Sequence, residues 1–563
     1  MGETGMILIL LAGVIATHWI GRALGGRIAL PLIQIAAGAA IGLATRFGIA
    51  LEPETFFVIF LPPLLFLDGW RVPKQDLQDN AALIASLAFG LVFVTVLGVG
   101  LLLRALIPAM PPAICFALAA VLSPTDVVAA TAMVTRVSVP RRMLRLLEGE
   151  ALFNDASALL CLRLAVTVAM TGSVPIWSSL GGLAWTALGG IALGAGLSQL
   201  VTWLKFRIVA RFGEDTSSSI LISLLTPYGA YLLADALGSS GVLAAVAAGM
   251  VMSRVEVSGR ALAVTRIRRN AVWETLAFAL NGSIFLLLGE QLPDLLARVH
   301  PGTAESGHGG LWWLGAYVLA ISLAMAVLRF VWVWAMVGIW LGRDAGSASP
   351  RRRPNLRLVA AMSSAGVRGA VTLAAALSLP LALPDGTPFP FRDLVILLAA
   401  GVILVSLVLA NIALPALIRG VALPPEPLDD RQERAARIEA AKAAIAALST
   451  AGEAPGGKVR TVAEADAQGG RLAAVALVAD YYQHRLAQLQ PEAPDTPPAG
   501  TLQDEDRLHV LALRAERAAI VGMARGHRIS TDLAHKLLRE TDLAEAAFEN
   551  AADAFRGEGR PTP

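Results

Sequence analysis

The stretch PAICFALAAVLSPTDVVAATAMV, residues 112–134, is apolar except for one polar interruption at its centre. A bilayer core about 30 Å thick needs roughly 20 apolar residues in a helix, and this stretch has that length. Pro124 removes one backbone donor and frees a carbonyl, so either a proline kink or a full break is expected at Ser123-Pro124-Thr125-Asp126. Unwound backbone in a membrane needs polar surroundings. The stretch therefore predicts a membrane span with a polar site at its break.

Apolar stretches of similar length recur over the first three-quarters of the chain. The 563 residues are 56% hydrophobic and 16% charged, with a mean hydropathy of +0.64, which excludes a single soluble core. We predict an all-α polytopic membrane protein with about thirteen spans. The expected spans are residues 6–24, 28–46, 54–70, 80–106, 112–134, 147–171, 178–204, 217–236, 239–254, 272–291, 311–341, 356–383 and 392–419.

Basic residues between the spans predict the orientation of the chain. Every second loop is rich in Arg and Lys, as at Arg136–Arg145, Lys205–Arg211 and Arg260–Arg269. Cytoplasmic loops carry this excess, so we expect an inner-membrane protein with its N-terminus outside and its C-terminus in the cytoplasm. The same loops explain the net charge of +3 and the pI near 9.0 without nucleic acid as a partner. Cys115 and Cys161 lie in apolar runs and form no ligand cluster.

The composition changes to Ala, Glu, Arg and Asp after Arg419. We therefore expect a transmembrane domain at residues 1–420 and a cytoplasmic helical C-terminal domain at residues 421–563. Apolar residues recur in this tail at helical spacing, namely Ile438, Ala441, Ile445 and Leu448. Breaks at Gly452–Gly457 and Pro491–Gly500 divide it into several amphipathic helices. No motif identifies the partner of the tail.

Six charged residues stand inside or at the edge of predicted spans, where each costs roughly 2.5–3.5 kcal/mol on insertion scales. They are Asp126, Glu150, Asp155, Arg163, Arg329 and Arg368. Such residues mark a transport pathway or pair with one another, and both readings are open for this set. The Thr125 hydroxyl, the Asp126 carboxylate and freed carbonyls are hard oxygen ligands of the kind that a dehydrated alkali cation requires.

A second polar interruption, Ser363-Ser364-Ala365-Gly366-Val367-Arg368-Gly369, falls in the twelfth predicted span. Spans one to six and eight to thirteen can be superposed as two inverted repeats, which places both interruptions at corresponding positions. Secondary transporters build their midplane ion sites from broken helices in this way. We therefore expect the two broken helices to cross at the membrane midplane.

The sixth predicted span carries two acids, Glu150 and Asp155, on different faces. They lie about one and a half helical turns apart, so Asp155 can face the broken fifth span while Glu150 meets an arginine elsewhere. A desolvated carboxylate holds either a proton or a cation, and the two ligands then compete for one site. Competition at one carboxylate is sufficient for exchange.

Three motifs together resemble the monovalent cation/proton antiporter family, in its bacterial NhaP-type branch. They are Pro124-Thr125-Asp126, Glu150-Ala151-Leu152-Phe153-Asn154-Asp155 and Gly366-Val367-Arg368-Gly369, in this order over residues 1 to about 420. The resemblance implies that the chain is a secondary transporter and not an enzyme. The transporter would exchange Na⁺, or alternatively K⁺ or Li⁺, for H⁺ in pH and sodium homeostasis. No cofactor is implied.

The resemblance further implies an architecture and a mode of transport. The expected fold has NhaA/NapA/NhaP-like inverted repeats, with a dimerisation part at about spans 1–3 and 7–10 and an ion-transporting core at about spans 4–6 and 11–13. A homodimer in membrane lipids would carry out elevator-type exchange with an electroneutral 1:1 stoichiometry.

Residue roles also come from the resemblance. The expected cation and proton ligands are Asp155, Asp126, Thr125 and Asn154, with Ser123, Asp68 and Arg329 as further candidates. Asp155 resembles the ion-binding carboxylate, and Na⁺ is expected at Asp155, Asp126 and Thr125. Asn154 occupies the place where electrogenic relatives carry a second acid, which agrees with one charge moving each way.

Glu150 and Arg368 resemble a buried structural ion pair of the family. Two positions depart from its pattern, because Ala151 replaces a serine and Leu67 replaces an acid that several relatives carry. Asp68, next to Leu67, could compensate from the adjacent face. These substitutions weaken any prediction of sodium over potassium.

Other functional classes fit the sequence less well. Gly238-Ser239-Ser240-Gly241 matches the motif of a serine nucleophile, but His300 and His308 lie in an outer loop and not in a span. A receptor that signals through the tail would leave the charged residues in the spans unexplained. A channel with the same site stays an alternative, distinguished by flux without proton coupling.

Overall fold

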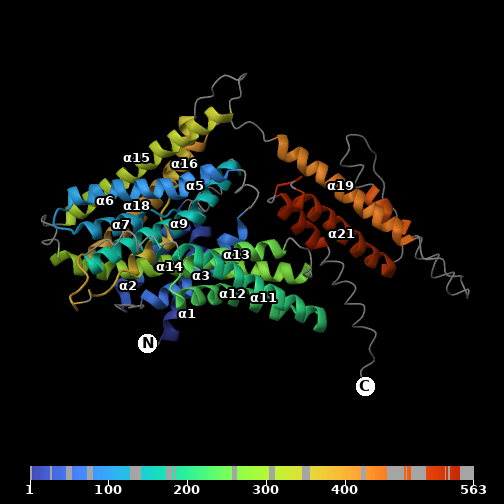
Figure 1. Cartoon of the computed structure of the whole chain (residues 1–563), viewed down its shortest axis with the longest axis horizontal. Coiled ribbons are helices and arrows are strands. Elements are labelled where there is room, and N and C mark those ends of the chain that lie inside the picture. Colours follow the sequence, from blue (N-terminus) through green and yellow to red (C-terminus); the bar gives the residue numbers. More distant parts are fainter. Residues whose placement is uncertain are drawn as a thin grey trace, which may run out of the picture.

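The computed structural model describes most of the membrane-spanning region and parts of the tail (Figure 1). The described residues are 3–25, 28–45, 53–72, 80–126, 141–172, 181–182, 185–256, 263–302, 311–344, 355–383, 385–419, 427–452, 475–476, 478–483, 502–526, 528–530 and 533–544. Among them the only β-type pairing is an isolated bridge between Ala382 and Pro388. The predicted all-α class is confirmed.

Every predicted span contains a helix or a broken pair of helices. In chain order these are α1 (Glu3–Ala23), α2 (Leu30–Thr45), α3 (Pro53–Arg71), α5 (Ala81–Ala85) continuing through the π-helical η1 (Ser86–Leu91) into α6 (Val92–Leu106), α7 (Pro112–Leu122), α9 (Arg141–Thr171), η2 (Trp185–Gly189) with α11 (Gly190–Phe212), α12 (Thr216–Ala236), α13 (Gly241–Glu256), α14 (Ala263–Gly302), α15 (Leu311–Asp344), α16 (Leu356–Ser364), α17 (Ala370–Leu377) and α18 (Arg392–Ile418). Residues 127–134 of the fifth predicted span lie outside the described residues.

The helices have the apolar character that lipid requires. Within the described residues, seven helices are long and apolar enough to cross a membrane, and shorter apolar helices accompany them. On α6, Phe93, Leu97 and Leu101 repeat every fourth residue and are all exposed, so they form one outward apolar stripe. Such a stripe is unfavourable in water and favourable against lipid tails.

Packing divides the membrane helices into two groups. The first group, α1 to α3 with α11 to α14, is built on close contacts between α2 and α14 and between α13 and its neighbours α3 and α11. The second group, α5 to α9 with α15 to α18, packs around α7, which is almost completely buried. Contacts between the groups are sparser and involve mainly α3, α14, α17 and α18.

The described residues of the tail form helices. Helix α19 (Pro427–Gly452) ends where the glycine-rich break was expected, and it packs along α21 (Leu502–Arg525) (Figure 1). Short helical segments at 478–483 and 533–544 complete this small core. The second predicted break, at 491–500, lies outside the described residues.

Candidate functional site

The two predicted interruptions meet inside the second group of helices. Helix α7 ends at Leu122, and residues 123–126 are not helical. The other interruption separates α16 from α17 at residues 365–369. The backbone N–H of Asp126 donates to the Val367 carbonyl at 2.7 Å, which ties the two unwound segments together. Each segment thus satisfies backbone groups that the other leaves open.

Two glycines allow this close approach. A Cβ atom on Gly369 would overlap the Asp126 carboxylate, and one on Gly366 would lie 2.5 Å from Nε of Arg329. Real Cβ atoms do not come that near to other heavy atoms. Glycine at both positions is therefore required for the charged side chains to reach the crossing.

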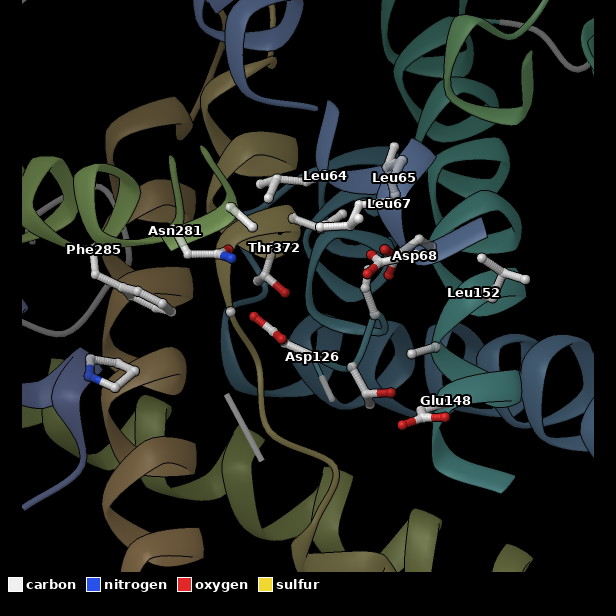
Figure 2. A pocket seen from close by; sticks show the side chains of 18 of the residues that line it. Leu64, Leu65, Leu67, Asp68, Asp126, Glu148, Leu152, Asn281, Phe285 and Thr372 are labelled. Atoms are coloured by element: carbon white, nitrogen blue, oxygen red, sulfur yellow. The ribbon is translucent and has the colours of Figure 1, made fainter. Parts of the chain in front are cut away.

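A cavity of about 520 Å³ opens beside the crossing (Figure 2). Three aspartates from different elements line it, which are Asp68 of α3, Asp126 of the first interruption and Asp155 of α9. Other polar residues line it as well, namely the uncharged Gln34, Thr125, Asn281 and Thr372, the acidic Glu148 and the basic Arg71. The walls come from both helix groups, so the cavity lies at their boundary.

Asp155 is the least exposed of the three aspartates. Its exposed fraction is 7%, and within the described residues its Oδ1 atom accepts no hydrogen bond. A buried carboxylate oxygen in this state is available to a proton or a cation. In the part of the chain that the structure describes, no three His, Cys, Asp or Glu side chains form a metal-binding cluster. A cation here would therefore need hydroxyl, carbonyl or water oxygens in addition to one or two carboxylates.

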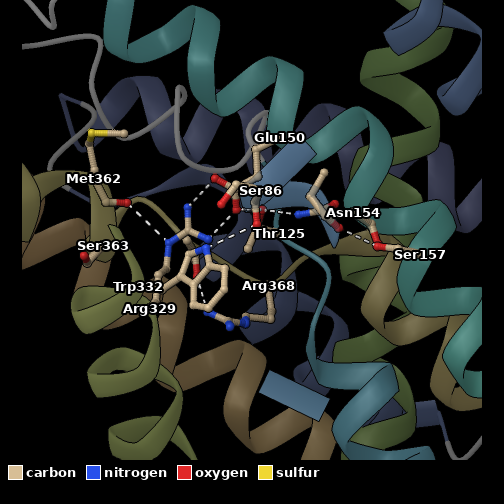
Figure 3. A network of polar contacts seen from close by, with 12 residues as sticks. Ser86, Thr125, Glu150, Asn154, Ser157, Arg329, Trp332, Met362, Ser363 and Arg368 are labelled. Carbon is tan, nitrogen blue, oxygen red and sulfur yellow. Dashed lines mark hydrogen bonds and ion pairs between the residues drawn. The ribbon is translucent and has the colours of Figure 1, made fainter. Parts of the chain in front are cut away.

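Thr125 joins the cavity to a buried polar network (Figure 3). Its hydroxyl accepts a hydrogen bond from Nδ2 of Asn154 at 2.7 Å and donates to Oε1 of Glu150 at 3.4 Å. Asn154 is thus positioned behind Thr125 and does not line the cavity. Ser157 fixes the same helix by donating to the Ala88 carbonyl in the π-helical turn η1, at 2.6 Å.

The predicted pairing of Glu150 with Arg368 is wrong. Glu150 instead forms a bidentate ion pair with Arg329 of α15, in which Nη2 donates to Oε2 at 2.8 Å and Nη1 donates to Oε1 (Figure 3). Both side chains are buried, with exposed fractions of 1% and 3%. Arg329 also donates from Nε to the Met362 carbonyl at 3.4 Å.

Arg368 has different partners for a physical reason. The helix breaks leave carbonyl oxygens without helical donors, and Arg368 donates to two of them, Leu122 O at 3.1 Å and Gly366 O. Its guanidinium therefore caps the C-terminal end of α7, where the helix dipole is negative. Its backbone N–H donates to Oγ of Ser406 at 3.1 Å. Arg368 thus stabilises the crossing, while Arg329 neutralises Glu150.

Several other residues singled out in the sequence lie apart from the cavity. Ser123 does not line it and donates to the Ala120 carbonyl at 2.9 Å. Arg163 lies on an exposed face of α9. Ser239 belongs to the turn between α12 and α13 and donates to the Trp185 carbonyl at 3.0 Å. Its hydroxyl therefore has a structural partner in the backbone.

The cavity also contains polar residues that sequence reasoning missed. Asn281 is a polar residue in the apolar span 272–291, and Thr372 lies just after the second interruption. Glu148 precedes Glu150 by two residues and points to the same cavity region as Asp68 (Figure 2). A search for all polar residues within spans, instead of charged ones alone, would have found Asn281 and Thr372.

Comparisons with known proteins agree with this architecture. A family model described as "Sodium/hydrogen exchanger, transmembrane" matches residues 6–420. The uncharacterized Na(+)/H(+) exchanger YjcE of Escherichia coli is 37% identical over 96% of this chain and 98% of its own. A sodium, potassium, lithium and rubidium/H(+) antiporter of Bacillus pumilus is 35% identical over 97% of this chain and 78% of its own.

The fold is also similar to a solved structure. The sodium proton antiporter MjNhaP1 from Methanocaldococcus jannaschii aligns with a TM-score of 0.58 at 17% identity, covering 75% of this chain and 99% of that one. This likeness concerns the arrangement of the helices. Together with the two broken helices that cross, it confirms the predicted fold class.

Proposed function

The chain belongs to the sodium/hydrogen exchanger family, and from that membership we propose that it exchanges Na⁺ for H⁺ across the inner membrane at Asp155. The observation that carries the proposal is the cavity in which Asp68, Asp126 and Asp155 surround the crossing of two broken helices. Acids at this depth are costly in a membrane protein and are retained where they bind an ion or a proton.

Asp155 is the proposed exchange group. When Asp155 is ionised, its Oδ1 atom, which accepts no hydrogen bond within the described residues, binds the cation. Asp126 supplies a second carboxylate from across the cavity. Thr125 contributes its hydroxyl oxygen while Asn154 holds that hydroxyl in place. Asp68 stands on the wall formed by α3, where it would attract the cation into the cavity.

Exchange follows from competition between the two ligands. Protonation of Asp155 removes the charge that holds the cation, so one proton replaces one cation. Asn154 is uncharged and Glu150 is neutralised by Arg329, so neither adds a second exchangeable proton. The expected stoichiometry is therefore electroneutral, with one cation for one proton.

The two helix groups support an elevator-type movement. The first group would form the dimer, and the second would carry Asp155 and the crossing from one side of the membrane to the other. Sparse contacts between the groups favour sliding of one on the other, whereas the crossing itself is held by many hydrogen bonds. We propose an outside N-terminus and a cytoplasmic tail on the basis of the positive loops.

The cation selectivity is the most specific part of the proposal. The name of the Bacillus pumilus relative includes sodium, potassium, lithium and rubidium. A site with few fixed protein ligands and room for water, as in this cavity, discriminates weakly between alkali cations because water replaces missing ligands. We therefore propose Na⁺ as substrate, with K⁺ and Li⁺ also accepted.

Proteoliposomes with an internal pH-sensitive dye test the exchange. The wild-type protein should move protons when Na⁺, K⁺ or Li⁺ is added, and Asp155→Asn should abolish this movement while still inserting as a folded protein. Asp294→Asn is the matched control, because this exposed aspartate on α14 does not line the cavity. Full exchange by Asp155→Asn would disprove the assignment, and cation flux without proton movement would establish a channel.

A further inference from the structure

A buried ion pair connects the C-terminal helices to the membrane-spanning part. Arg266 lies near the start of α14, and Asp542 lies in the last described helix, residues 533–544. Nε of Arg266 donates to Oδ2 of Asp542 at 2.7 Å, and Nη2 donates to Oδ1. The exposed fractions of the two side chains are 4% and 9%. This bidentate geometry fixes the contact in position as well as in charge.

A second arginine approaches the same carboxylate. Nε of Arg517, on α21, lies 3.3 Å from Oδ1 of Asp542, and the Arg517 side chain is also buried. One carboxylate of the chain thus lies between two guanidinium groups from different helices. Planar guanidinium groups bind phosphoryl oxygens in the same fork geometry as carboxylate oxygens.

A small cavity of about 160 Å³ adjoins these groups. Arg266, Arg517, His535 and Arg539 line it, and the acids in its wall are Asp542 and Glu274. Basic groups therefore exceed acidic ones around the cavity. Its volume is well below the roughly 300–1,000 Å³ of pockets for drug-sized ligands. It suits a small anion or the terminal group of a larger one.

We propose that this cavity binds a phosphoryl group, which competes with the Asp542 carboxylate for Arg266 and Arg517. A phosphoryl group carries about −1.5 to −2 charges and three acceptor oxygens, against one charge and two oxygens for the carboxylate. Arg539, which is exposed at the rim, adds a contact that Asp542 does not use. Binding would loosen the hold of helix 533–544 on α14.

Helix α14 links this site to the cation cavity. Arg266 and Asn270 line the small cavity, and Asn281 and Phe285 of the same helix line the large one. The distance along the helix from Arg266 to Asn281 is about 22 Å. The inference that the phosphoryl group changes the exchange rate rests on the proposed function. The inference that the small cavity binds a phosphoryl group does not depend on that function.

Titration calorimetry with pyrophosphate tests the binding step on the full-length protein in phosphatidylcholine nanodiscs. Arg539→Gln should weaken binding roughly tenfold through loss of one charged contact, and Asp542→Asn should tighten it because the competing charge is removed. Arg525→Gln, exposed on α21 outside the cavity, should bind as the wild type does. Absent binding, or equal affinity in Asp542→Asn and the wild type, would overturn the competition.

Hydrogen exchange of helix 533–544 distinguishes the two sources of a phosphoryl group. If the ligand is soluble, pyrophosphate should reduce protection of this helix in phosphatidylcholine nanodiscs. If the ligand is a lipid headgroup, nanodiscs that contain phosphatidic acid, whose headgroup is a phosphomonoester, should reduce it without pyrophosphate. Unchanged protection in both arms would refute the site. These readouts need no transport, so they stand or fall separately from the exchange assay.

Discussion

At the level of single residues, the partners of Arg329 and Arg368 explain why the Asp155 carboxylate stays available for an ion. Arg329 is occupied by Glu150, and Arg368 is occupied by the carbonyl groups of the crossing. The carboxylate of Asp155 retains an oxygen that accepts no hydrogen bond within the described residues. Arg329 and Arg368 therefore stabilise the fold around Asp155 without neutralising it.

A double-mutant cycle tests the assignment of these partners. Glu150→Gln combined with Arg329→Gln should show a coupling free energy of about 1–3 kcal/mol, since each single change leaves a buried charge without its counterion. Glu150→Gln combined with Arg368→Gln should be closer to additive. Unfolding free energies in detergent micelles measure both cycles. Stronger coupling of Glu150 to Arg368 than to Arg329 would restore the pairing that the resemblance implied.

Gly369 offers a second test at the residue scale. Gly369→Ala places a methyl group on the Asp126 carboxylate, so the crossing must shift and exchange should fall roughly tenfold to a hundredfold. Gly315→Ala on α15 is the matched control, because its Cβ meets no atom within 4 Å. Proteoliposome exchange rates of the two variants, at equal amounts of folded protein, give the comparison. Similar rates would mean that the crossing tolerates the methyl group.

Broken helices show, at the scale of the element, what the sequence allows to be predicted. Pro124 and the Gly366–Gly369 stretch mark the breaks, because local backbone chemistry determines where a helix cannot continue. The choice of Arg329 over Arg368 for Glu150 could not be predicted in this way. It depends on how α15 packs against α6, α16 and η1, and on carbonyl groups that compete for Arg368.

The pairing of α19 with helix 533–544 predicts a pH dependence in the tail. Lys536 donates to Glu433 at 2.8 Å, and this bond, with a further contribution from Arg437, lowers the pKa of Glu433 from its ordinary value of 4.5. Because the pKa of Glu433 is lower in the folded state than in the unfolded state, its ionisation stabilises the folded state at pH values above the unfolded-state pKa. This contribution is lost as the pH falls through the folded-state pKa.

Hydrogen exchange in α19 measures this contribution. Protection should decrease between pH 5 and pH 3 by about 0.2–1 kcal/mol in opening free energy, since the pair is partly exposed and screened. Glu433→Gln should be less protected at pH 7 and should lose this part of the pH dependence. Arg434→Gln, exposed on the same helix, serves as control. An equal pH response in Glu433→Gln and the wild type would contradict the assignment.

At the scale of the whole molecule, some features can be predicted from the sequence and others cannot. The positions of the membrane helices agree with the apolar stretches to within a few residues at most ends, because burial in lipid requires a minimum length. Helix α14 is longer than the predicted span 272–291, since its polar first turns continue to the contact with the tail. Hydropathy does not reveal that extension. Contacts between distant segments, such as Arg266 with Asp542, need the folded chain.

Charge balance over the whole transport cycle gives the last prediction. If one proton replaces one cation at Asp155, the moving helices carry the same charge in both directions. A membrane potential of 100 mV acts on each net charge with about 2.3 kcal/mol, so an electrogenic exchanger would shift its equilibrium ion ratio about fifty-fold for each charge. Here the Na⁺ and H⁺ gradients at zero flux should match at any membrane potential, which is set in K⁺-free and Li⁺-free buffers with a gradient of the permeant anion thiocyanate. A zero-flux ratio that changes with the potential would show that a second group besides Asp155 carries charge across the membrane.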